Sequence, residues 1–131
     1  MLESQILHDL AVYRIEQAEQ CYRSAVLLLE AGDYKASANR SYYCIFHSMR
    51  AVLAISGFDS KKHSGIISEF RRNYIKSGIF DMEFSDIIGS AFDVRGSSDY
   101  DDFYIASKSA VEEQLLGEKK FMNAVKAYLS V

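Results

Sequence analysis

No proline occurs anywhere in the sequence, although average usage of about 5% would give about six or seven in 131 residues. Proline interrupts helix interiors because it lacks an N–H donor and its ring clashes with the preceding turn. Its absence therefore favours long helices that are joined by short polar links.

Cysteines and long apolar runs are also scarce. The two cysteines, Cys21 and Cys44, form no CxxC pair and no metal-binding spacing, so we expect reduced thiols. Residues 1–9 include Glu3 and Asp9 and lack the basic start and apolar run of a secretory signal. No uncharged run approaches the roughly 18 residues that a membrane span needs. These absences favour a cytoplasmic protein that does not bind a membrane.

The composition that remains is 49% hydrophobic and 25% charged, which is typical of a globular chain. A length of 131 residues suits one domain, so we treat residues 1–131 as a single domain. The net charge of −3 argues against general coating of nucleic acid. Residues 61–76, however, carry five basic residues against one acid, a local excess that can attract a phosphate ligand.

Apolar periodicity predicts an all-α domain of five helices. We place them at about residues 4–31, 34–56, 62–76 and 83–94, and from Ser107 or Ser109 toward the C-terminus. Ser60 is the expected N-cap of the third helix, and Ser109 with Glu112 fits a capping box on the fifth. Residues 95–106 mix Gly, Ser and Asp and are interpreted as a loop, with Arg95 at its boundary.

The second helix is predicted to be central. One wide face is apolar and another carries small side chains, which together leave few positions for solvent. The apolar face comprises Ala38, Tyr42, Ile45, Phe46, Met49, Val52 and Leu53, and the small face comprises Ser37, Ser41, Cys44, Ser48 and Ala51. The short link to the first helix predicts an antiparallel hairpin. The excess of apolar and small positions also favours a homodimer.

Arg40, Tyr43 and His47 form a polar stripe on this central helix. Arg40 and His47 are almost two turns apart and lie within about 20° of each other around the axis, and Arg50 continues the line. Arginine is always charged and fork-shaped, and histidine ordinarily titrates near neutrality, so the stripe could bind a phosphate and assist proton transfer. The alternative is a polar helix edge with Arg40 paired to an acid and His47 bonded to backbone. On sequence alone that alternative is favoured.

Two further clusters of polar residues could carry chemistry. Lys61, Lys62, His63 and Ser64 precede or open the third helix, where free amides favour an anion, although a solvated basic turn explains them as well. Asp99, Asp101 and Asp102 could hold a hard cation, but they lack the regular spacing and closing Glu of calcium loops. We therefore predict no metal site. No phosphate-binding loop, dinucleotide fingerprint or nucleophile elbow is present, and no cofactor is predicted.

Three blocks of sequence resemble the HEPN family (higher eukaryotes and prokaryotes nucleotide-binding domain), especially its small stand-alone prokaryotic members. The blocks are DYKASANRSYYCIFHSMRAVL, SKKHSGIISEF and AFDVRGSSDYDDF, in that order. The resemblance implies an up-and-down helical bundle that dimerises and handles nucleotide or RNA. It also implies a nucleotidyltransferase partner in a toxin–antitoxin or defence module.

Many members of that family are metal-independent endoribonucleases, with an Arg and a His separated by four to six residues. Arg95 matches the arginine, but Tyr100 stands where the histidine is expected, and tyrosine, with a pKa of about 10, is a poor base at neutral pH. Arg40 and His47 have the spacing but lie on a different helix, and they could converge with His63 and Arg95 as a relocated site. In related pairs a tyrosine beside the motif receives a nucleotide.

The resemblance and the residues together favour a HEPN-like nucleotide- or RNA-binding protein with a degenerate ribonuclease motif. The expected binding residues are Arg40, Tyr43, His47, Lys62, His63, Arg95 and Tyr100. One alternative is an active endoribonuclease toxin that uses Arg95 with a displaced base, His47 or His63. The other is a non-catalytic helical interaction protein.

Overall fold

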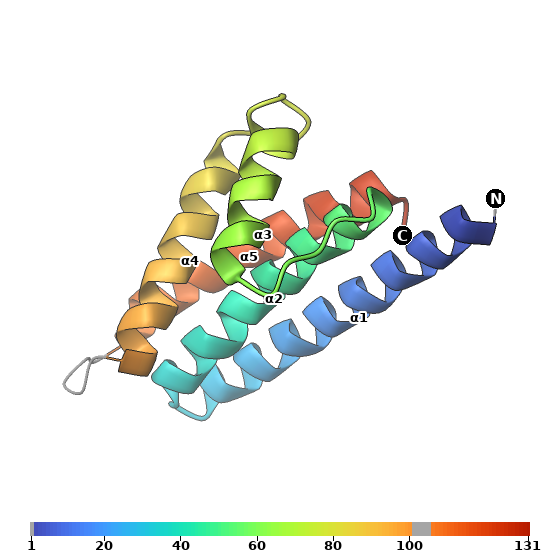
Figure 1. Cartoon of the computed structure of the whole chain (residues 1–131). Coiled ribbons are helices and arrows are strands. Elements are labelled where there is room, and N and C mark those ends of the chain that lie inside the picture. Colours follow the sequence, from blue (N-terminus) through green and yellow to red (C-terminus); the bar gives the residue numbers. More distant parts are fainter. Residues whose placement is uncertain (1, 101–105) are drawn as a thin grey trace.

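The computed structural model describes the backbone of residues 2–100 and 106–131, and the side chains of all of these except residues 97–100. These residues form an all-α bundle (Figure 1). Its elements are α1 (Leu2–Glu30), α2 (Tyr34–Ile55), α3 (His63–Phe70), the single π-helical turn η1 (Arg71–Ile75), α4 (Glu83–Tyr100) and α5 (Lys108–Leu129). The predicted all-α fold is confirmed.

The helices α1 and α2 form the predicted antiparallel hairpin (Figure 1). Gly32 ends α1 with a φ of 81°, a left-handed conformation that glycine adopts without steric cost. The Asp33 side chain then caps α2 by accepting a hydrogen bond of 3.2 Å from the Ala36 N–H. This tight turn fixes the register in which the two helices pack.

The central position of α2 is confirmed, because it packs against α1, α3, α4 and α5. Both of its predicted faces are covered within one chain. Every residue of the apolar face and of the small-residue face is buried. The apolar face joins a core that includes Phe70, Ile88 and Phe121 from the later elements. The excess of apolar positions on α2 is therefore used inside the monomer and leaves no open apolar face on this helix for a second copy.

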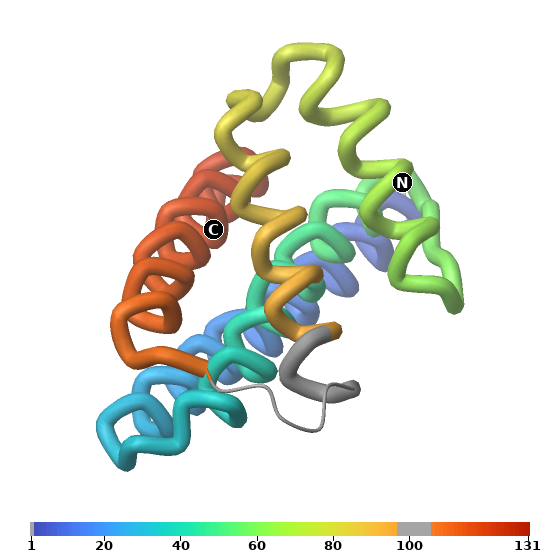
Figure 2. Tube along the Cα trace, turned by 90° about the vertical axis from the view of Figure 1, so that its left-hand side faces the viewer, coloured from blue at the N-terminus to red at the C-terminus, as the bar shows by residue number. Residues whose placement is uncertain are grey.

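The linker of residues 56–62 places the next elements over the middle of α2. It runs back along α2 from its C-terminal end, so that α3 begins beside the centre of the hairpin (Figure 1). The α3–η1 segment and α4 then form a second antiparallel pair, which crosses the first (Figure 2). Arg95 on α4 and His63 at the start of α3 are brought to the same stretch of α2 in this way.

Two sequence-based boundaries are wrong. α4 continues to Tyr100, so Arg95 lies inside a helix and not at the edge of a loop. Glycine and serine are weak helix formers, but they cost at most about 1 kcal/mol each relative to alanine, and no proline forces an end. The rest of the predicted loop, residues 101–105, lies outside the described residues.

The predicted N-cap of the third helix is also wrong. Lys62 precedes α3 and makes no side-chain cap, while the Ser60 hydroxyl accepts a hydrogen bond of 3.2 Å from the Lys62 N–H. On α5 the earlier of the two expected starts is correct, because the Ser107 hydroxyl accepts from the Ala110 N–H at 3.2 Å. Ser109 is therefore inside the first turn and does not form the expected capping box.

Candidate nucleotide-binding site

Tyr42, Tyr43, His63 and Arg95 form a compact group that we call the Arg95 cluster. The Tyr42 hydroxyl and His63 Nδ1 share a hydrogen bond of 2.8 Å. The Arg95 guanidinium lies 5.5 Å from the Tyr42 ring centre and 5.9 Å from that of Tyr43. Its Nη2 donates a long hydrogen bond of 3.4 Å to the Tyr43 hydroxyl. Residues that are far apart in the sequence thus build one cationic and aromatic cluster, in which Tyr42 is fully buried and Tyr43 is partly exposed.

His63 is held by aromatic contacts in the same cluster. Its ring stacks on Phe46 with a centroid distance of 4.1 Å and meets the Tyr43 ring edge-on at 5.9 Å. Burial, followed by the charges of Arg95 and Arg50, lowers the pKa of His63 below its ordinary value. His63 is therefore neutral at pH 7, and with Nδ1 engaged by Tyr42, Nε2 is the ring nitrogen left for a ligand.

A second feature, which we call the linker pocket, adjoins His63. It is an open hollow of about 610 Å³ lined by Phe46, Arg50, Asp59, Ser60, Lys61 and His63. Asp59 neutralises part of its positive charge, because its carboxylate accepts from Arg50 Nε at 3.3 Å and from Arg50 Nη2 at 3.0 Å. Lys62 is exposed beside this pocket and does not line it.

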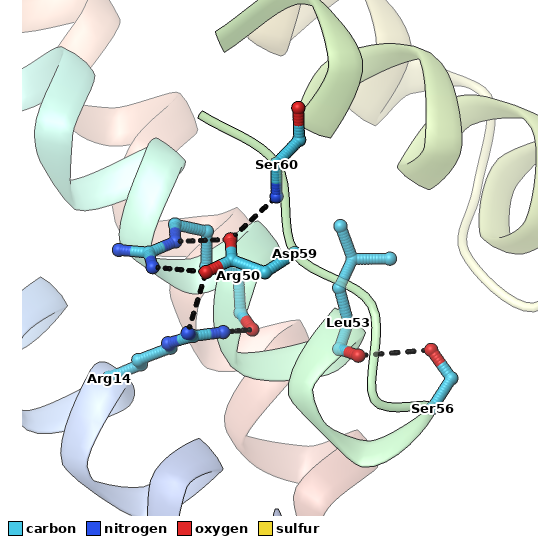
Figure 3. Close-up of polar contacts among 6 residues, drawn as sticks. All are labelled: Arg14, Arg50, Leu53, Ser56, Asp59 and Ser60. Carbon is cyan, nitrogen blue, oxygen red and sulfur yellow. Dashed lines mark hydrogen bonds and ion pairs between the residues drawn. The ribbon is translucent and has the colours of Figure 1, made fainter. Parts of the chain in front are cut away.

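The buried residue Arg14 joins the linker to the helical hairpin (Figure 3). Its Nη2 donates to Asp59 at 3.3 Å and its Nη1 to the backbone oxygen of Arg50 at 3.0 Å. The Ser60 N–H completes the set with a 2.9 Å hydrogen bond to the Asp59 carboxylate. This network fixes residues 59–60 against α1 and α2, and so it positions the adjacent Lys61 and His63.

A third feature, which we call the α1–α2 pocket, is lined by two residues of the predicted stripe, Arg40 and His47. It is a polar hollow of about 220 Å³ lined by Gln17, Gln20, Cys21 and Ser24 of α1 and by Arg40 and His47 of α2. Burial lowers the pKa of His47 to about 4, helped by Arg50, Arg14, Arg40 and His63. The expectation that His47 titrates near neutrality is wrong for this environment, and its imidazole is uncharged at pH 7.

If the stripe were only a polar helix edge, Arg40 would pair with an acid and His47 would form a hydrogen bond to the backbone. Neither contact is present among the described residues. Arg40 makes no ion pair with a described carboxylate, and its guanidinium instead lies 5.4 Å from the Tyr43 ring centre. His47 Nδ1 is buried and has no described hydrogen-bond partner. The stripe is therefore not a polar edge whose groups satisfy one another in the described structure.

Most of the predicted site residues come together in one band across α2. Tyr43 contacts Arg40, His47, His63 and Arg95, and Lys62 flanks the band at the start of α3. The Tyr100 side chain, like all of Asp101, Asp102 and Tyr104, lies outside the described residues.

Sequence reasoning missed several residues that position this band. The helical pattern places Tyr42 and Phe46 in the core alone, and it gives no signal for Asp59, Gln17 or Gln20. The sequence does give a signal for Arg14, because a charged residue at an otherwise apolar position of α1, between Ala11 and Ile15, needs a buried partner. The partner itself, 45 positions further along the chain, could not be named from that pattern.

The described residues include neither a candidate metal-binding group nor a helix that could span a membrane. The described part of the chain has no group of three or more His, Cys, Asp or Glu side chains that could hold a metal ion. Within the same residues, no helix has both the length and the apolar character needed to cross a membrane.

A family model described as the HEPN domain matches residues 11–128, which is most of the sequence. The chain belongs to the HEPN family. The relatives of this HEPN chain include the protein named Putative toxin MJ0142 of Methanocaldococcus jannaschii, which is 31% identical over 115 residues, 88% of this chain and 78% of that protein. A second protein of the same organism, named Putative toxin MJ0605, is 34% identical over 86 residues, 66% of this chain and 64% of that protein.

A solved structure shows the same fold. The crystal structure of ST0689, an archaeal HEPN homologue, matches with a TM-score of 0.65 at 19% identity and covers 91% of this chain and 97% of that one. In this HEPN chain Arg95 lies on α4 and contacts Tyr42 and Tyr43, while the histidine that contacts the same two tyrosines is His63 of α3.

Proposed function

We propose that this HEPN protein binds RNA or a nucleotide through the Arg95 cluster and acts as the toxin-like component of a toxin–antitoxin or defence module. The observation that carries the proposal is the placement of Arg95 over Tyr42 and Tyr43, beside His63. An arginine fork binds phosphate oxygens, and the partly exposed Tyr43 ring can accept a stacked base. The names of the two relatives, which describe toxins, support the toxin part of the proposal.

Arg95 supplies the test of binding. With a fluorescently labelled single-stranded RNA and with AMP as ligands, Arg95→Gln should weaken binding about tenfold or more, because hydrogen bonds to charged groups contribute about 1.5–3 kcal/mol. Arg72→Gln is the matched control, since Arg72 is an exposed cation that pairs with Glu69 outside the band. Wild-type affinity in the Arg95 variant, or no binding of either ligand by the wild type, would contradict the proposal.

A second candidate, metal-independent RNA cleavage, is favoured by one observation. His63 and Arg95 provide a neutral imidazole and a fixed cation on the same pair of tyrosines, which is the kind of arrangement that proton transfer beside a phosphate requires. In the same binding experiment, cleavage would be measured with chelator present. His63→Ala should reduce it about a hundred- to ten-thousandfold, while His8→Ala, at an exposed position of α1 outside the band, should change it little. Cleavage that survives His63→Ala would remove this candidate.

The proposal includes two protein partners that the family resemblance implies. One is a second copy of the chain, and the other is a nucleotidyltransferase encoded in the same module. The non-catalytic interaction protein remains the competing function. It would be supported if tight binding to such a partner were found together with flat calorimetric titrations of RNA and nucleotides.

A further inference from the structure

The α1–α2 pocket is adjacent to the Arg95 cluster, but α1 forms half of it and α4 contributes no lining residue. Its polar walls share one chemical property. The amides of Gln17 and Gln20, the Ser24 hydroxyl, the Arg40 guanidinium and the His47 ring can all donate hydrogen bonds, and no carboxylate is among the described lining residues. A pocket with donors and one fixed cation is suited to an oxyanion.

Two groups in this pocket lack the partners that a closed protein surface would provide. His47 Nδ1 is buried without a described hydrogen bond, and a buried polar atom in that state costs free energy until a ligand or water satisfies it. Arg40 lines the pocket and makes no ion pair with a described carboxylate. The linker pocket differs, because its arginine, Arg50, already pairs with the Asp59 carboxylate.

Tyr43 does not line the α1–α2 pocket, but its ring contacts Arg40 and His47 of that pocket and Arg95 of the Arg95 cluster. The guanidiniums of Arg40 and Arg95 lie 5.4 Å and 5.9 Å from its ring centre, so the two charges are at most about 11 Å apart. That separation suits phosphates one or two nucleotides apart on an extended strand. The Tyr43 ring between them offers a surface on which a base can stack.

We infer that the α1–α2 pocket is a second phosphate subsite, in which Arg40, His47 and the two glutamines hold a neighbouring phosphate of a single-stranded RNA bound at the Arg95 cluster. The ligand of this site is then an oligonucleotide and not a mononucleotide. The inference rests on the proposed function and specifies its substrate.

Ligand length and salt dependence test this inference on the full chain. Arg40→Gln should weaken binding of a labelled RNA hexamer about tenfold and should lower the slope of log Kd against log salt by about 0.7, the value for one phosphate contact on a single strand. Binding of AMP should not change. Arg23→Gln is the matched control, because Arg23 is an exposed cation of α1 that does not line the pocket. It should leave both ligands unaffected.

Inorganic phosphate separates a strand subsite from an independent anion site. The inference is overturned if Arg40→Gln and Arg23→Gln bind the hexamer equally well, or if Arg40→Gln weakens AMP as much as the hexamer. It is also overturned if phosphate shifts the His47 ring signals in NMR spectra while Arg40→Gln leaves hexamer affinity unchanged. In all three cases loss of binding by Arg95→Gln still supports the proposed function. If the wild type binds neither RNA nor AMP, both proposals fail.

Discussion

Glu118 of α5 is completely buried, and neither of its carboxylate oxygens has a described hydrogen-bond partner of good geometry. Burial raises its pKa to about 8, and the nearby Ser41 and Gln114 side chains offset only part of this effect. Glu118 therefore keeps its proton in the folded chain at neutral pH. A carboxylic acid at this position behaves as a polar neutral group packed against the small-residue face of α2.

This protonation couples stability to pH. The unfolded chain loses the Glu118 proton near the ordinary pKa of 4.5, whereas the folded chain keeps it until about pH 8. Between these values unfolding releases a proton, so this residue makes the free energy of unfolding fall by about 1.4 kcal/mol per pH unit as pH rises. Glu118→Gln should remove that slope and become more stable than the wild type as pH approaches 8.

Denaturant titrations at pH 5, 6.5 and 8 measure this difference between the variant and the wild type. The exposed Glu112 provides the matched control, and Glu112→Gln should track the wild type at every pH. A constant difference between Glu118→Gln and the wild type over this range would show that Glu118 is already ionised in the folded chain.

At the scale of single residues, the sequence predicted the relative positions of residues that lie on the same helix. Arg40, Tyr43 and His47 share an edge of α2 because helical geometry fixes their relative angles. The low pKa of His47 was not predictable, since it depends on burial against α1 and on Arg14, which approaches from another helix. The same limit applies to Glu118, whose spacing on α5 does not reveal that its side chain points at the small face of α2.

At the scale of elements, Asp59 fastens the linker to two helices. Its carboxylate receives Arg14 from α1, Arg50 from α2 and the Ser60 N–H of the linker itself (Figure 3). Burial opposes the charge of Asp59, but the hydrogen bond from Arg50, the Ser60 N–H and the two positive charges outweigh it and lower its pKa. The linker is thus held by an ionised carboxylate over most of the pH range.

Asp59→Asn should loosen this element and leave Arg14 buried without a counter-charge. We expect a loss of about 1–2 kcal/mol in the free energy of unfolding at pH 7, less than for a fully buried pair because the Asp59 side chain is 49% exposed. Hydrogen exchange should increase at the Ser60 N–H and across residues 56–62. Asp93→Asn, at an exposed position of α4, is the control. Unchanged exchange in the linker would mean that other contacts hold it.

Three of the five helices were predicted well, and the fourth was predicted too short. α1 and α2 match because strong apolar periodicity and the glycines of positive φ at Gly32 and Gly57 mark them, and α5 matches because of its apolar periodicity. The end of α4 was wrong because serine, glycine and aspartate lower helix propensity only slightly, and packing against α2 overrides them. Where the linker places α3 depends on contacts such as Arg14 with Asp59, which no local pattern contains.

At the scale of the whole molecule, one chain closes its own core. The main buried cluster draws residues from all five helices and η1, and the faces of α2 that first suggested a homodimer are covered inside the monomer. A dimer of this HEPN chain therefore has to form through surfaces outside that core. Its dissociation should then be separate from unfolding.

We expect sedimentation at micromolar concentration to give about twice the 14.9 kDa chain mass, and dilution to give a folded monomer. When folding and association are separate, helical circular dichroism persists below the dissociation constant and the unfolding midpoint of the dilute monomer no longer depends on protein concentration. A single transition that loses helix and dimer together on dilution would show that the interface is part of the folding core. A monomer at every concentration would contradict the homodimer, and the band across α2 would then have to bind its ligand with one chain alone.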